Sequence, residues 1–249
     1  MVQNTRLGGG RTLIDGTGYD IKLQIGTLLS EIPVGNTVKI AVNGTMRDWL
    51  VVNQGIPSGS TLYDDSCNGT WLLMRDCYEK RQWNNRNDQN ISNSTIFAYL
   101  DGTFFNLFDA GIRSIIKQVK IPYCAGSSGS SVFVGEHGLS RRIFLLSCYE
   151  VGWTKSTSNY IPDDGAKLDY FSAKTNASST AQDSVAYLDG TAVKWWLRSA
   201  SSYDSGYVWY LSTSGAIRQQ ECIDTSVGVR PAMILPFETL VADDGTVLA

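Results

Sequence analysis

The 249-residue sequence contains few of the residues on which metal centres and common catalytic sites depend. His137 is its single histidine, and it lies in a polar stretch, VGEHGLS. The five cysteines, at positions 67, 77, 124, 148 and 222, include no Cys-x-x-Cys pair. Zinc sites draw on histidines and closely spaced cysteines. The sequence therefore argues against a zinc centre and predicts reduced, partly buried thiols.

Several functional classes also lack support in the sequence. The net charge is −3, and the scattered Lys and Arg form no basic stripe of the kind that nucleic-acid binding uses. No apolar run reaches the ~18 residues that a membrane span requires, and the first residues lack the apolar core of a signal peptide. Motifs for dinucleotide binding, P-loops, metalloproteases and serine hydrolases do not occur. We expect no nucleic-acid partner, no membrane insertion and no catalytic residues.

No cofactor is expected, although structural calcium stays open as an alternative. Carboxylate pairs such as Asp163-Asp164 and Asp243-Asp244 stand in turn contexts beside glycine. Turn formation and hydration explain them more simply than a calcium site does.

The amino-acid composition fits a globular domain, because 43% of the residues are hydrophobic. Asn43-Gly44 stands between two β-rich runs and predicts a hairpin. Residues 93–108 follow a helical period, and Asp109 is a candidate cap for a second helix. The expected apolar faces are Ile96, Leu100, Phe104, Leu107 and Phe108 in the first helix and Ile112, Ile115, Ile116 and Val119 in the second.

The last third of the domain is rich in short β-like runs. VKWWLRS, YVWYLS, AIRQQEC and VGVRPAMIL predict strands, and Ser212–Gly215 (STSG) predicts a hairpin turn between two of them. A short helix is expected at Lys167–Phe171. The hexapeptide AYLDGT occurs at 98–103 and 186–191, by coincidence or as a shared helix-end motif. Two helices and many short strands without βαβ alternation predict an α+β fold that ends in an antiparallel β-meander.

Three segments are expected along the chain. Residues 1–30 are Gly-rich and are interpreted as an N-terminal arm or attachment segment, with an ordinary first strand as the alternative. Residues 31–236 form the domain. Residues 237–249 are expected to be a C-terminal tail.

Fixed-looking motifs surround a polar segment near the C-terminus. Trp195, Trp196, Trp209 and residues 229–235 are expected in the core. Arg198 and Arg230 lie inside apolar runs, and buried guanidinium groups must find partners. We expect them to tie strands and loops together through carbonyls or carboxylates, with ligand contact as the less favoured interpretation.

The framed segment, 201–227, has the composition of a binding surface. Tyrosine offers a large contact area with few torsions to freeze, and serine and glycine add adaptability. Tyr203, Tyr207 and Tyr210 are the expected exposed anchors. The alternative is an ordinary meander surface with no ligand.

Together the motifs resemble a known family. WWLRS, VW-x-L-S-x-S-G and GVRPA look like the variable region of proteins diversified by retroelements, which have a C-type-lectin fold of the branch that includes formylglycine-generating enzymes. Upstream motifs also resemble gut-phage proteins of this type, so that the resemblance covers about residues 30–236, and GGGRTLIDGTGYDI resembles the start of phage structural proteins. The upstream motifs are IPVG, GTWLLMRDCYEKRQW, NSTIFAYLDGTFFNLF, IKQVKIPY and IFLLSCYEVGW.

The resemblance implies a set of diversified positions. In that family template adenines are copied with errors, so an Asn codon can become Tyr, Ser, Asp, Gly, Thr, Ala, Arg, Ile, Val or Cys, but not Trp, Gln or Glu. Segment 201–227 contains no Asn, and Gln219, Gln220 and Glu221 depart from the pattern. The implied ligand-binding residues are Ser201, Ser202, Tyr203, Asp204, Ser205, Gly206, Tyr207, Tyr210, Ser212, Ala216, Arg218, Ile223, Asp224, Thr225 and Val227.

The function implied is non-enzymatic binding of an unknown protein or cell-surface ligand, for phage receptor binding or adhesion. The protein would be made in the bacterial cytoplasm and carried on a phage virion, with the bacterial surface as the alternative location and an oligomer as an open possibility. Two other functions stay open: an enzyme of the formylglycine-generating type, and a virion subunit without a specific ligand. Against the enzyme, only Cys222 lies near the region that corresponds to that family's reactive, copper-binding cysteine pair.

Overall fold

The computed structural model describes residues 13–14, 20–21, 26–126, 131–179 and 181–249. Most of the expected arm over residues 1–30 lies outside these ranges. Within it, β1 (Leu13–Ile14) pairs antiparallel with β2 (Asp20–Ile21). The other strands are β3 (Thr27–Leu28), β4 (Thr37–Val42), β5 (Thr45–Gln54), β6 (Thr70–Met74), β7 (Glu79–Lys80), β8 (Val119–Ile121), β9 (Tyr123–Cys124), β10 (Val132–Phe133), β11 (Leu139–Arg141), β12 (Ala186–Leu188), β13 (Thr191–Val193), β14 (Trp195–Ala200), β15 (Tyr207–Leu211), β16 (Ile217–Glu221), β17 (Gly228–Val229), β18 (Ala232–Leu235), β19 (Leu240–Val241) and β20 (Val247–Leu248).

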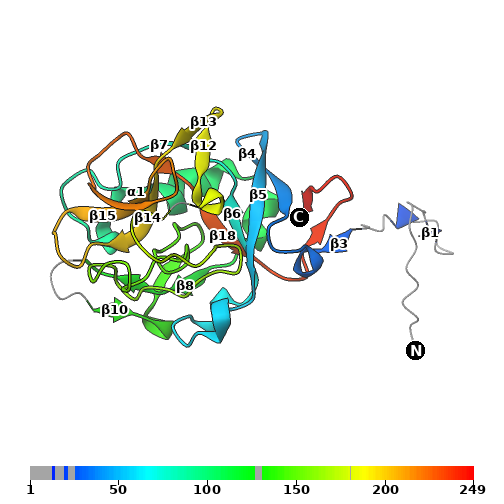
Figure 1. Cartoon of the computed structure of the whole chain (residues 1–249). Helices are drawn as coiled ribbons and strands as arrows, with labels where there is room; N and C mark the ends of the chain where they lie inside the picture. The colour runs from blue at the N-terminus through cyan, green and yellow to red at the C-terminus, as the bar shows by residue number, and fades with distance from the viewer. Residues whose placement is uncertain (1–12, 15–19, 22–25, 127–130, 180) are drawn as a thin grey trace.

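A four-stranded antiparallel sheet crosses the middle of the molecule in the order β18-β6-β5-β4 (Figure 1). The expected hairpin at Asn43-Gly44 is confirmed, since both residues have positive φ, 50° and 71°, and join β4 to β5. Every residue of β6 is buried. A strand covered on both faces reads as a continuous apolar run, which explains the TWLLM sequence of β6.

The second large sheet contains the polar segment. Its order is β16-β15-β14-β17-β7, and β14, β15 and β16 form an antiparallel meander. Segment 201–227 was expected to rest on strands at 195–199 and 229–235, and this is wrong for the second strand, which is divided between the two sheets. β17 pairs parallel to β14, with Gly228 opposite Trp195, whereas β18 belongs to the first sheet. The GVRPA motif therefore links the two sheets.

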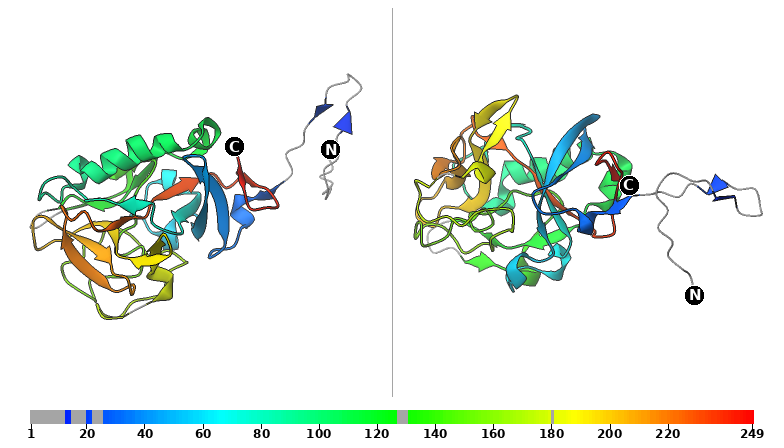
Figure 2. Two further views of the ribbon diagram at one scale, coloured as in Figure 1. Left: turned by 90° about the horizontal axis from the view of Figure 1, so that it is seen from above. Right: turned by 45° about the vertical axis from the view of Figure 1, so that its right-hand side comes forward.

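Both expected helices are present, but the second is shorter than expected, because Val119, expected on its apolar face, lies in β8. α1 (Thr95–Tyr99) continues through a π-helical turn at Leu100–Phe104 and a 3-10 turn at Phe105–Leu107, and α2 (Ala110–Ile115) follows. Asp109 caps α2 as expected, because its Oδ1 accepts a hydrogen bond from the Ile112 amide at 2.9 Å. The helical stretch lies along one flank of the molecule, with β15 on the other (Figure 2, left).

The structure differs from the expected one at residues 167–171 and at the C-terminus. The helix expected at Lys167–Phe171 is wrong, because the chain there makes only a turn, closed by the Phe171 amide and the Leu168 carbonyl. Residues 237–249, expected to be a tail, contribute β19 and β20 to a sheet with β3. The mixed α+β class is confirmed. None of the helices in the described part of the chain has the length and apolar character that a bilayer crossing requires.

Candidate binding surface

The three tryptophans around the polar segment belong to the core, as expected. Trp195 and Trp196 are fully buried and Trp209 is 5% exposed. The Trp195 indole donates to the Ser184 carbonyl at 2.9 Å, and the Trp196 indole donates to the Arg81 carbonyl at 2.8 Å. These bonds fix β14 between distant parts of the chain, so the base of the surface is rigid.

Arg198 of the WWLRS motif lies in a buried ion pair directly under this surface. Its two terminal nitrogens each donate to a Glu150 oxygen at 2.6 Å. Its remaining donors reach the carbonyls of Pro122, Leu145 and Asp164 at 2.8–3.0 Å. Burial opposes the charged guanidinium, but the charge and hydrogen bonds of Glu150, with smaller contributions from Asp164 and Tyr63, together raise the pKa of Arg198. The expected role as a tie between strands and loops is confirmed.

A second carboxyl group, Asp164, lies buried beside this pair. Its Oδ1 accepts from the Ser199 hydroxyl at 2.9 Å, whereas its Oδ2 has no hydrogen-bond partner in the described chain. Burial raises the pKa of Asp164 to about 7, against a smaller lowering by the charge of Arg198. Asp164 is therefore fixed in the scaffold, and the calcium alternative at Asp163-Asp164 loses one of its two ligands to the core.

The turn after β14 is held from inside the protein. The Ser201 hydroxyl accepts from the amides of Tyr203 and Asp204 at 3.2 and 3.3 Å, and its carbonyl accepts from Gln89 at 2.9 Å. Gly206 has φ +94°, which favours glycine, and its carbonyl accepts from the Cys222 amide. The turn thus presents residues 203–205 outward on two buried supports.

The hairpin expected at Ser212–Gly215 is also present. β15 and β16 pair with Tyr210 opposite Arg218 and Val208 opposite Gln220, and Val208 is buried. The Arg218 guanidinium donates to the Ala177 carbonyl at 2.6 Å and so attaches the hairpin to a neighbouring loop.

The fifteen expected binding residues differ in their exposure. The exposed ones are Tyr203, Asp204, Ser205, Arg218, Ile223 and Thr225. Those of intermediate exposure are Ser202, Tyr207, Tyr210, Ser212 and Asp224. The buried ones are Ser201, Gly206, Ala216 and Val227. The buried four shape the surface and do not present side chains on it.

Only one of the three tyrosine anchors is strongly exposed. Tyr203 is 63% exposed, whereas Tyr207 and Tyr210 are half-buried. Tyr210 packs edge-on against Trp196, with ring centroids 6.3 Å apart, and the Lys194 ammonium lies 5.5 Å from its ring centre. The expectation of three exposed tyrosines therefore holds fully for Tyr203 alone.

Tyr160 joins the surface from outside the expected segment. Its ring centroid lies 4.6 Å from that of Tyr203, and 44% of the residue is exposed. The Ser202 amide donates to the Tyr160 carbonyl at 3.1 Å, which holds the two loops together. Sequence reasoning missed Tyr160, because nothing in its polar loop sets it apart from an ordinary surface tyrosine.

A hollow of about 400 Å³ opens beside the turn that carries Tyr203. Residues 87–90 form one wall, and Ala125, Gly126, Ser205 and Gly206 form the rest. We call the exposed set, with Tyr160 and this hollow, the variable face. Segment 201–227, coloured orange, lies at the end of the molecule opposite β3 and the C-terminus in all three views (Figures 1 and 2).

Burial predicts which positions of segment 201–227 tolerate large side chains. Ser201→Tyr should lower the free energy of unfolding by at least about 1–3 kcal/mol, because it overpacks a buried site and disrupts the hydrogen bonds of the turn. Ser205→Tyr, the same change at an exposed position of the same turn, should stay within about 0.5 kcal/mol. Urea unfolding of the two variants measures the difference. Equal effects would show that burial does not govern tolerance here.

The cysteines and the histidine lie outside the variable face or below it. All five cysteines are buried. Burial raises the pKa of the Cys222 thiol. The side chain of His137 is 76% exposed. Among the residues that the structure describes, no three His, Cys, Asp or Glu side chains gather closely enough to hold a metal ion.

Comparison with known proteins gives a family but no function. No curated protein and no solved structure matches the chain. The model of the domain of unknown function DUF6273 matches residues 68–237, which include β6, both helices, the second large sheet and the whole variable segment. Since this match covers more than half of the sequence, the chain belongs to the DUF6273 family.

Proposed function

We propose that the chain is a non-enzymatic binding protein whose variable face is diversified by a retroelement on a C-type-lectin-like scaffold. Its ligand is a protein or another cell-surface molecule, and its role is phage receptor binding or adhesion. The variable face is the binding site. The proposal combines the motif resemblance with the arrangement of the residues around β14.

One observation carries the proposal: the WWLRS and GVRPA motifs are buried, whereas eleven of the fifteen implied variable positions are exposed or of intermediate exposure. Trp195, Trp196 and Arg198 of WWLRS and Arg230 of GVRPA are at most 1% exposed. Six of the implied positions that they frame have exposed side chains, at turns and on β16. Substitutions at exposed sites usually change stability by less than about 0.5 kcal/mol, so ligand contacts can change while the fold persists.

The Tyr160–Tyr203 pair gives the variable face an aromatic centre. Exposed aromatic side chains keep apolar surface in contact with water, and interface hot spots are enriched in tyrosine. Rings already in contact with each other lose less side-chain entropy when a ligand binds. Both features favour a binding role over an inert surface.

The thiol chemistry favours this function over the formylglycine-generating type. Cys222 is fully buried, and burial raises the pKa of its thiol. A nucleophilic or copper-binding cysteine acts as the thiolate and usually has a lowered pKa and an accessible sulfur. The environment of Cys222 has the opposite character.

Sequencing the locus across a population tests the proposal directly. Amino-acid changes should concentrate in the codons for the exposed positions of the variable face and spare the codons for Trp195, Arg198 and Arg230. Changes spread evenly over residues 31–236 would contradict diversification.

Binding to a panel of whole bacterial cells tests the role of the aromatic centre. For cells that the protein binds, Tyr203→Ala should weaken binding by about 30-fold, the factor that corresponds to a hot spot of about 2 kcal/mol. The melting temperature should stay nearly unchanged. Tyr187→Ala removes an exposed tyrosine from β12 and is the matched control, expected to bind as the unmodified protein does. Equal binding by both variants would place the contact elsewhere.

A further inference from the structure

The two buried arginines of the scaffold motifs differ in one respect. Arg198 uses all its donors and has Glu150 as its counter-charge. Arg230 is 1% exposed and donates only to the carbonyls of Met74 and Arg75, both at 2.9 Å. Its Nη1 has no hydrogen-bond partner, and no carboxylate of the described residues lies within ion-pair distance. Burial without a counter-ion lowers the pKa of Arg230.

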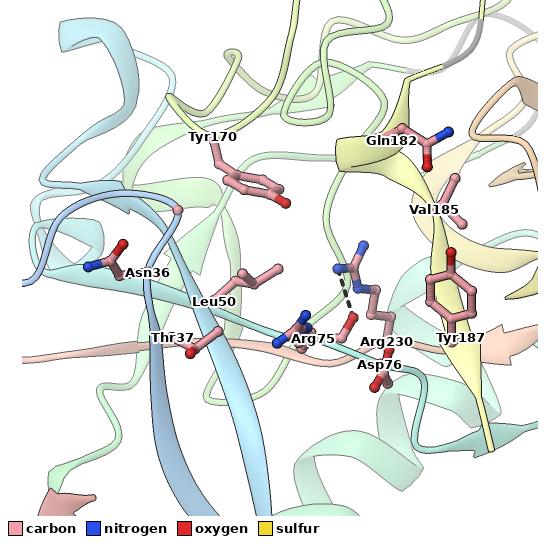
Figure 3. A pocket seen from close by; sticks show the side chains of 11 residues that line it. Asn36, Thr37, Leu50, Arg75, Asp76, Tyr170, Gln182, Val185, Tyr187 and Arg230 are labelled. Carbon is pink, nitrogen blue, oxygen red and sulfur yellow. Dashed lines mark hydrogen bonds between the residues drawn. The ribbon is translucent and has the colours of Figure 1, made fainter. Parts of the chain in front are cut away.

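This guanidinium, whose Nη1 lacks a hydrogen-bond partner, lines a pocket of about 530 Å³. The pocket lies between the β4–β5 hairpin, the loop that carries Tyr170, and β12, away from the variable face. Figure 3 shows the Arg230 nitrogen that bonds the Arg75 carbonyl on one side, and the other terminal nitrogen turned toward the space between Tyr170 and Val185. The volume is in the range of small-molecule sites, about 300–1,000 Å³.

The pocket walls combine aromatic, apolar and polar groups. Tyr170 and Tyr187 lie on opposite sides, with Leu50 and Val185 as apolar contacts. Among the lining residues two are cationic, Arg75 and Arg230, and Asp76 is the one anion. Arg75 already lies 3.5 Å from Asp48. Arg230 packs over the Trp195 ring, 4.8 Å from its centre, and is the cation that lacks a carboxylate partner.

We infer that this pocket binds a small monocarboxylate with a flat or apolar body, whose carboxylate pairs with Arg230. A buried donor without a partner is rare in native proteins and calls for a ligand, an ion or a water. Arginine matches the planar geometry of a carboxylate. Asp76 at the same pocket disfavours a dianion such as a phosphate monoester, because like charges repel at close range. The aromatic walls suit a ring.

Three probes that share a phenyl ring and differ in charge test which charge the pocket selects. Benzoate should bind and raise the melting temperature with concentration, because a ligand that binds only the folded state stabilises it. Benzamide, which is neutral, and phenyl phosphate, which is a dianion near neutral pH, should each bind at least tenfold more weakly by calorimetry. Equal binding of benzoate and benzamide would overturn the role of charge, and no binding of any probe would overturn the site.

Two substitutions tie the binding to the pocket. Arg230→Gln removes the charge and should abolish benzoate binding. Because Arg230 is buried, Thr37→Glu serves where that variant does not fold: Thr37 is exposed, lines the pocket, and would add a repelling carboxylate. Thr45→Glu, at the other end of the same hairpin and outside the pocket lining, is the matched control. Benzoate affinity should fall at least tenfold in Thr37→Glu and stay unchanged in Thr45→Glu; equal affinities would overturn the inference.

Discussion

Replacing Glu150 with alanine should destabilise the protein by about 3–5 kcal/mol, the cost of leaving a buried charge without its partner. The Glu150 carboxylate accepts from both terminal nitrogens of Arg198, from the Tyr63 hydroxyl at 2.8 Å and from the Ser147 amide at 2.9 Å. All these donors would lose their acceptor in a site that water does not reach. Since domains are stable by only about 5–15 kcal/mol, the variant should be close to unfolding. Urea denaturation, read from the midpoint at constant slope, measures the loss.

A surface ion pair supplies the control for this result. Arg75 and Asp48 lie 3.5 Å apart with side chains 58% and 43% exposed. Asp48→Ala should cost no more than about 1 kcal/mol, because water and salt screen exposed charges. A Glu150→Ala protein as stable as Asp48→Ala would mean that the Arg198 charge finds another partner or leaves the core.

The second large effect is a loss of stability as pH rises from about 4 to 7, caused by Asp164. Burial raises the pKa of its carboxyl to about 7 in the folded protein, whereas the ordinary pKa is 3.8. Between these values the folded form holds one more proton than the unfolded chain, so stability is full below pH about 4 and falls as pH rises. Three pKa units correspond to a loss on the order of 4 kcal/mol. Asp164→Asn cannot ionise and should remove most of this decline.

Thermal unfolding at pH 5, 6, 7 and 8 measures the slope for both proteins. Asp163→Asn is the control, since Asp163 is the adjacent residue and its side chain is 48% exposed. Carboxyls whose pKa is lowered, such as Asp183 and Asp224, give their full stabilisation above pH 4 and do not contribute to a decline in this window. An Asp164→Asn protein that keeps the original slope would show that another group titrates.

Local patterns predicted the parts of the fold that local physics decides. Asn43-Gly44 and Ser212–Gly215 gave correct hairpins because residues with positive φ select a few turn types. The helical period over 93–108 placed Ile96, Leu100 and Phe104 on the buried face. The composition of 201–227 marked a segment whose exposed positions lie mainly at turns.

Other features depend on contacts between distant residues and left no local signal. The hexapeptide AYLDGT is helical at 98–103 but forms β12 and a turn at 186–191, where Asp189 and Gly190 have positive φ. The same six residues thus follow their surroundings. Arg198 was expected to have a partner, but nothing in IFLLSCYEVGW identified Glu150, which lies 48 residues earlier in the chain. Tyr160 was missed for the same reason.

The places where the chain enters and leaves the variable face determine whether segment 201–227 can be lengthened. β14 leads into the segment at Ser201, and β17 brings the chain back to the side of the same strand, where Gly228 pairs with Trp195. One buried strand therefore holds both ends, and the tip at Thr213 and Ser214 is exposed. Doubling the length of a flexible loop costs only about 0.6 kcal/mol in closure entropy. The hairpin tip can accept inserted residues without disturbing β14, so the reach of the surface can vary as well as its chemistry.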